Sequence, residues 1–272
     1  MSHFKYGCES YSWVMSGDKY LGNIPHLCKV ISQAGLAGIE TSLRMAGDYG
    51  KDPGAMSEVL KEYDLALVAT SLGGNFGESP RLRAEERTAA EQVFDFISHF
   101  PEPRLSLSHY SRDRDNLLTR QRNAMACYNE VGRMATDRGI DCALHPSSYS
   151  TSIFITDSDY RVMLDEMDPK VVKYCPDTGH IANGDMDVYE IFTTYMSNIG
   201  HVHMKDITED KRWAPNGEGS IDFPRLMKML DEANYEGWIV FEEESDAARE
   251  DPDTATLKNG RYRKDTLLPL GY

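Results

Sequence analysis

The chain has 272 residues, 40% of them hydrophobic, an ordinary size for one closed α/β barrel of roughly 250 residues. Acidic residues number 44 against 29 basic ones, and the resulting net charge of −15 repels nucleic-acid phosphates and anionic membranes. We therefore expect neither a nucleic acid nor a membrane as a partner.

Short apolar runs alternate with amphipathic helical stretches along the whole chain. Eight of these runs predict β-strands, which begin near Lys5, Ala37, Leu65, Arg104, Ile140, Val171, Ile199 and Trp238. Each interval has room for one strand, one helix and two loops, and this alternation predicts a parallel sheet. Eight repeats predict an α/β fold in which residues 1–272 form a single (β/α)8 TIM-barrel domain, with a C-terminal tail from about residue 246.

Helix signals occupy the intervals between the predicted strands. Asn23 and Pro25 indicate the start of a helix that ends at Gly35, and Asp222 precedes another. The apolar end of the tail, residues 267–270, leaves three alternatives open: packing on the barrel, contact with a second subunit, or a frayed terminus.

The cysteines and the N-terminal segment favour a cytoplasmic protein. The five cysteines contain no CxxC pair, which is typical of reduced, mostly buried thiols. The segment from Met1 to Lys5 lacks the apolar stretch of a signal peptide. No apolar run approaches the roughly 18 residues that a membrane span needs.

The last four predicted strands all end in side chains that can bind a metal ion, in the part of a barrel where reactive residues lie. These side chains are His145, Asp177, His201 and His203, and Glu242, Glu243 and Glu244. Because side chains alternate along a strand, His201 and His203 share one face, as do Glu242 and Glu244. A core hydrogen bond or a helix cap would explain each residue alone, but donors on four neighbouring strands indicate a site for one divalent ion.

Four segments resemble the sugar phosphate isomerase/epimerase superfamily of xylose isomerase-like barrels. They are PDTGH at 176–180, HVHMKD at 201–206, GEGSIDF at 217–223 and YEGWIVFEEE at 235–244. The resemblance covers the C-terminal half closely and reaches the N-terminal half through GLAGIETS at 35–42. It implies a metal bound by His145, Asp177, His203 and Glu242. Manganese is the favoured ion, and magnesium, cobalt, iron and zinc are alternatives.

The resemblance also implies the chemistry, with His145, Glu242 and His180 as catalytic residues. It implies an isomerase or epimerase that takes a proton next to the carbonyl of a keto-sugar or related polyol, through a metal-stabilised enediolate. Position 145, however, is His where such epimerases usually have Glu, and HPSSYS at 145–150 resembles the inosose dehydratase branch. A lyase is therefore the alternative, either inosose dehydratase-like or acting by β-elimination on 3-keto-glycosides, as a C-glycoside deglycosidase does.

A nuclease of the endonuclease IV type shares this barrel, but it needs more histidine ligands and a basic groove, which the net charge of −15 disfavours. The expected partner is a small-molecule carbohydrate, and both a homo-oligomer and a small second subunit stay open. Ordinary packing also stays open for each candidate substrate contact, namely His180, Lys205, Glu40, His109, Trp13 and Glu244.

Overall fold

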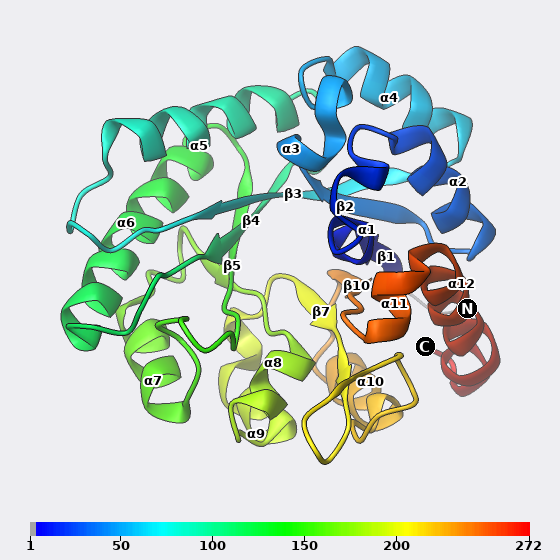
Figure 1. Cartoon of the computed structure of the whole chain (residues 1–272). Helices are drawn as coiled ribbons and strands as arrows, with labels where there is room; N and C mark the ends of the chain where they lie inside the picture. The colour runs from blue at the N-terminus through cyan, green and yellow to red at the C-terminus, as the bar shows by residue number, and fades with distance from the viewer. Residues whose placement is uncertain (1–3) are drawn as a thin grey trace. The chain divides into compact units, whose positions relative to one another are not determined.

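Each of the eight runs that predicts a strand forms one, and the pairs between them are parallel (Figure 1). The computed structural model describes residues 4–272. Residues 1–3, which belong to the N-terminal segment in which we expect no signal peptide, lie outside the described residues. The described chain divides into unit 1, residues 4–68 and 202–272, and unit 2, residues 69–201. The expectation of one domain over the whole chain stays a prediction.

Unit 1 contains four strands in the order β2-β1-β10-β7. Their bounds are Lys5–Glu9 for β1, Gly38–Ser42 for β2, Val202–Met204 for β7 and Trp238–Phe241 for β10. The register pairs Glu9 with Glu40 and Val240 with His203. Because registered neighbours in a parallel sheet point to the same side and side chains alternate along each strand, the acidic strand ends and His203 share one face.

The helices of unit 1 begin where the sequence signals predict them. Asp222 caps α10 by accepting a hydrogen bond from the Arg225 backbone N–H at 3.0 Å, whereas Asn23 precedes α2 without a side-chain capping bond. The bounds are Tyr11–Val14 for α1, Ile24–Gln33 for α2, Leu43–Ala46 for α3, Pro53–Glu62 for α4, Phe223–Glu232 for α10, Asp246–Glu250 for α11 and Pro252–Tyr262 for α12.

The predicted tail packs on unit 1 through α11 and α12, which lie beside α1 and α2 in Figure 1. The Asp253 carboxylate accepts a hydrogen bond from Trp13 Nε1 at 2.8 Å and lies 2.8 Å from His26 Nε2. Leu267 is fully buried, which confirms packing on the same chain, whereas Leu270 is 54% exposed. Association with a second subunit through the exposed end stays a prediction.

Unit 2 contains β4, β5 and β6 and most of β3, in the order β3-β4-β5-β6, and the first three residues of β3 belong to unit 1. Register pairs Gly73 with Ser108 and Ser108 with His145, so His145 shares its face with small side chains. The bounds are Ala66–Gly74 for β3, Arg104–His109 for β4, Asp141–His145 for β5, Lys173–Tyr174 for β6, Ala84–Ile97 for α5, Leu117–Thr136 for α6, Asp157–Glu166 for α7, Thr178–Asn183 for α8 and Val188–Tyr195 for α9.

A short antiparallel pair of strands follows β7, and the sequence did not predict it. It joins β8 (Asp206–Ile207) to β9 (Trp213–Ala214). The Asp206 carboxylate then accepts hydrogen bonds from backbone N–H groups of the GEGSIDF segment, including those of Gly217 and Gly219 at 2.9 Å. A Cβ on Gly219 would come 2.2 Å from Asp206 Oδ1, so this close approach requires glycine. The HVHMKD motif, through Asp206, therefore holds the backbone of the GEGSIDF motif in place.

Candidate metal and substrate site

In unit 1, two buried carboxylates bracket the imidazole of His203. Its Nδ1 lies 2.6 Å from Glu242 Oε2, and its Nε2 lies 3.1 Å from Glu40 Oε2. His203 lies within β7, Glu40 lies within β2 and Glu242 directly follows β10, and all three are at most 5% exposed. An imidazole and carboxylate oxygens are donors that suit several divalent transition metals.

Lys205 lies immediately after β7 and its side chain is fully buried. Its Nζ is 2.7 Å from Glu242 Oε1 and 2.5 Å from Glu244 Oε1, and it also lies 5.1 Å from the centre of the Trp213 ring. The pairing with both glutamates confirms that Glu242 and Glu244 share a face. Lys205 therefore holds two glutamates in place, and direct contact with substrate stays a prediction for it.

Glu9, the last residue of β1, completes this acidic cluster and had no place among the candidate site residues. Desolvation by burial raises the pKa of Glu9 well above its usual value, and the negative charges of Glu242 and Glu40 raise it further. Four buried glutamates thus lie around one lysine and one imidazole, and they cannot all be ionised together without a further cation. A divalent ion would favour their ionised forms, so the residues of unit 1 fit a divalent metal.

In unit 2, three buried residues form a second donor cluster. His145 ends β5, Asp177 precedes α8 and His180 lies in its first turn; each offers one ligand atom, and these atoms lie within 4.8 Å of one another. Asp177 Oδ1 accepts the His180 backbone N–H at 2.7 Å, while Oδ2 is 3.5 Å from His145 Nε2. One carboxylate thus caps a helix and also faces a histidine. This buried cluster suggests a divalent metal site.

His180 is in contact with the loop that follows β5. Ser148 donates its backbone N–H to His180 Nδ1 at 3.2 Å, and its hydroxyl lies 2.8 Å from the same nitrogen. The His145 and His180 rings meet edge to face at 5.6 Å between centres, and Tyr149 packs on His180 at 5.5 Å. The structure therefore brings together the predicted catalytic histidines, and it adds Ser148, which the sequence had not singled out.

His109 and Trp13 interact with the helical layers of their own units. His109 Nδ1 lies 2.7 Å from the Tyr128 hydroxyl on α6, and burial, followed by the Arg120 charge, lowers the pKa of His109 to about 3. Trp13 is fully buried and donates to Asp253 on α12. These contacts are those of packing residues, and a substrate role for either stays a prediction.

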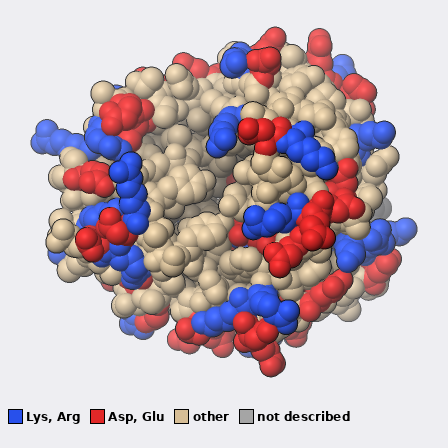
Figure 2. Space-filling model, in the orientation of Figure 1, with Lys and Arg blue, Asp and Glu red and all other residues tan. Residues whose placement is uncertain are grey.

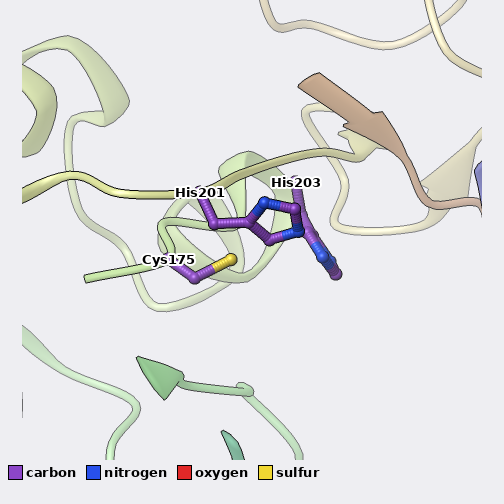
Figure 3. Close-up of side chains that lie close together, drawn as sticks. All are labelled: Cys175, His201 and His203. Carbon is purple, nitrogen blue, oxygen red and sulfur yellow. The ribbon is translucent and has the colours of Figure 1, made fainter. Parts of the chain in front are cut away.

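Cys175 and His201 form a buried pair in unit 2 that the sequence did not indicate (Figure 3, which also labels His203 of unit 1). Cys175 was expected only to be a buried thiol, and all five cysteines are indeed buried and free. A cysteine next to the end of β6 and a histidine before β7 carry no shared sequence pattern. Cys175 directly follows β6 and His201 directly precedes β7, so their proximity comes from the fold and not from a local sequence pattern.

Charged side chains of both signs lie on the surface of the described residues. Figure 2 shows basic and acidic side chains interspersed on the face in view. Among the described residues, no helix is both long enough and apolar enough to span a membrane. The exclusion of nucleic acid stays a prediction based on net charge.

Comparison with known proteins places these residues in a family context. An inosose dehydratase from Clostridium beijerinckii is 32% identical over 155 residues, which cover 50% of this chain and 51% of that protein. The chain thus matches about half the length of this relative. An inosose dehydratase from Clostridium perfringens is 22% identical, with 97% of this chain and 98% of that protein covered.

Solved structures share the fold at low sequence identity. A 3-keto-D-glucoside 4-epimerase from E. coli has a TM-score of 0.70 and 18% identity, covering 94% of this chain and 99% of that one. The IOLI protein, solved with a zinc atom, has a TM-score of 0.76 and 12% identity, covering 95% and 97%. The model of the xylose isomerase-like TIM barrel family matches residues 28–263. The chain therefore belongs to the xylose isomerase-like TIM barrel family, and the predicted (β/α)8 fold is confirmed.

Proposed function

We propose that the protein is a metal-dependent lyase that acts on a keto-sugar or keto-cyclitol. It would remove the proton next to the carbonyl and expel an oxygen substituent from the β-carbon. The observation that carries this proposal is His145, which ends β5 where a two-base epimerase would need a carboxylate. The inosose dehydratase relatives support it. Elimination thus moves ahead of isomerisation or epimerisation, which the sequence had favoured.

The ligands that we propose for the metal are Asp177, His203 and Glu242, with His145 as a fourth ligand or just outside the coordination shell. The support is chemical, since each side chain is buried and the acidic cluster of unit 1 holds more carboxyl groups than cationic side chains. A bound divalent ion would polarise the substrate carbonyl and stabilise negative charge on its oxygen. Manganese remains our expectation from the resemblance.

The side chains of the protein supply the proton transfers in this proposal. His145, as a neutral imidazole, takes the α-proton, and the electrons of that C–H bond pass into the enolate and then into a new C=C bond. The C–O bond at the β-carbon breaks, and the departing oxygen takes up the proton that His145 removed and leaves as water or an alcohol. His180 donates a hydrogen bond to that oxygen as the negative charge on it grows. Lys205 keeps Glu242 ionised and oriented through its 2.7 Å ion pair.

The test is a screen of the manganese-loaded enzyme against keto-inositols and 3-keto-glucosides, followed by proton NMR in deuterated water. We expect loss of water or of the aglycone, with deuterium exchange at the α-carbon. Exchange with inversion and no loss of a substituent would identify an epimerase instead. Turnover without any solvent exchange would refute proton abstraction altogether.

A further inference from the structure

A chain of hydrogen bonds ends on His180 Nδ1 and involves the HPSSYS segment, which the proposed chemistry uses only through His145. Asn183, at the end of α8, donates its side-chain N–H to Ser148 Oγ at 2.8 Å. Ser148 in turn approaches His180 Nδ1 twice, with its backbone N–H at 3.2 Å and its hydroxyl at 2.8 Å. His180 is 1% exposed and Ser148 is 7% exposed, so water competes little with these bonds.

The direction of these bonds determines the protonation of the imidazole. A backbone N–H can only donate, so Nδ1 must accept and carries no proton. Because the Asn183 amide donates to the Ser148 oxygen, the hydroxyl proton is available for the same nitrogen. In a neutral imidazole the single proton is then on Nε2. The loop after β5 and the end of α8 thus determine which nitrogen of His180 is a donor.

We propose that Ser148 and Asn183 are positioning residues that hold His180 as its Nε2–H tautomer. In this form Nε2 donates to a substrate oxygen, either a carbonyl, a hydroxyl or a leaving group, and it is not a metal ligand. This separates His180 from His145 and Asp177, with which it shares the donor cluster of unit 2. The role toward substrate rests on the proposed function, whereas the tautomer itself does not.

Ser147 provides a matched control for this proposal. It precedes Ser148 and is equally buried at 6% exposed, but its hydroxyl oxygen has no hydrogen-bond partner among the described residues. A general effect of removing a buried serine hydroxyl from this loop would therefore appear in both Ser147→Ala and Ser148→Ala. An effect on His180 would appear only in Ser148 variants.

Nitrogen NMR of protein labelled with 15N in its eight histidines tests the tautomer without substrate or turnover. The His180 signals are assigned by their loss in His180→Gln. We expect an unprotonated Nδ1 and a protonated Nε2 in the native protein and in Ser147→Ala. Ser148→Asp should raise the fraction of His180 that carries its proton on Nδ1, because the new carboxylate accepts from that nitrogen and competes with the backbone N–H that donates to it. A native Nδ1–H would overturn the proposal, as would a Ser148→Asp spectrum identical to that of the native protein.

The kinetic test uses whichever substrate the screen identifies. We expect Ser148→Ala, which keeps the backbone N–H, to lower kcat by about tenfold with little change in KM, and Ser148→Thr to restore most of the rate. An equal loss in Ser148→Thr would contradict positioning through the hydroxyl. If no substrate is found, the proposed function fails while the NMR result stands; if the tautomer is wrong, this inference fails whatever the substrate.

Discussion

Replacing Lys205 by methionine tests the electrostatics of the acidic cluster in unit 1. The lysine is fully buried, and its Nζ lies 2.7 Å from one carboxylate and 2.5 Å from another. Burial raises the pKa of Glu244 to about 7 even though Lys205 lowers it, so this carboxylate depends on the ammonium for its ionisation. Lys205→Met leaves Glu242 and Glu244 buried without that charge.

Removing one partner of a buried ion pair typically costs about 3–5 kcal/mol, because the remaining charge is uncompensated. We expect Lys205→Met to lower the free energy of unfolding by that amount in metal-free protein. The compensating double variant Lys205→Met, Glu244→Gln removes one negative charge along with the positive one. It should recover roughly half of the loss, since Glu242 still lacks the ammonium with which it pairs.

Urea denaturation followed by circular dichroism, with a chelator present, gives the comparison. The midpoint should fall in the single variant and rise again in the double variant, with similar slopes. A loss below about 1 kcal/mol in the single variant would contradict a strong buried ion pair. A double variant no more stable than the single one would show that lost packing of the lysine stem, rather than charge, explains the effect.

Three further predictions concern metal, pH and nucleic acid. Asp177→Ala should lose the single bound divalent ion, as measured by elemental analysis, and full metal occupancy in that variant would refute the ligand assignment. If His145 is the base, His145→Ala should keep its metal and lose about a hundred-fold or more in rate. Because burial lowers the pKa of His109 from 6.5 to about 3, the unfolded chain binds more protons than the folded chain in that window and stability falls with decreasing pH. The native protein should lose about 2 kcal/mol more than His109→Gln between roughly pH 7 and pH 5, and equal losses by urea denaturation would exclude this contribution. Finally, an abasic DNA duplex at low salt should not bind, and tight, salt-dependent binding would overturn the argument from net charge.

The eight barrel strands could be predicted from the sequence because each one is a short apolar run bounded by polar turns. Period-two alternation also predicted correctly that Glu242 and Glu244 lie on one face. The antiparallel pair β8–β9 was missed because strands of two residues carry no periodicity. In the same way, the ion pairs of Lys205 follow from the packing of β7 beside β10, which no local pattern encodes.

The contacts of candidate site residues were harder to predict than their positions. Trp13 was expected near the substrate, yet it donates to Asp253 on a helix near the end of the chain, and the course of that tail was left open by the sequence. Ser148 was overlooked because its importance depends on a loop path that brings its backbone N–H to His180. Side chains on strands follow a fixed alternation, whereas contacts made by loops depend on the fold as a whole.

The charge balance of unit 1 argues that the acidic cluster is built for a cation rather than for stability. Four buried glutamates with one lysine destabilise a metal-free protein, since carboxylates at close range cannot all remain ionised in a low-dielectric interior. Well-packed apolar residues would give a more stable sheet end. Burial first, and then the negative charges of Glu242 and Glu40, raise the pKa of Glu9, so the repulsion reaches a carboxyl group beyond those that pair with Lys205 or His203. A divalent ion relieves it, so metal affinity and the stability of this unit should be coupled.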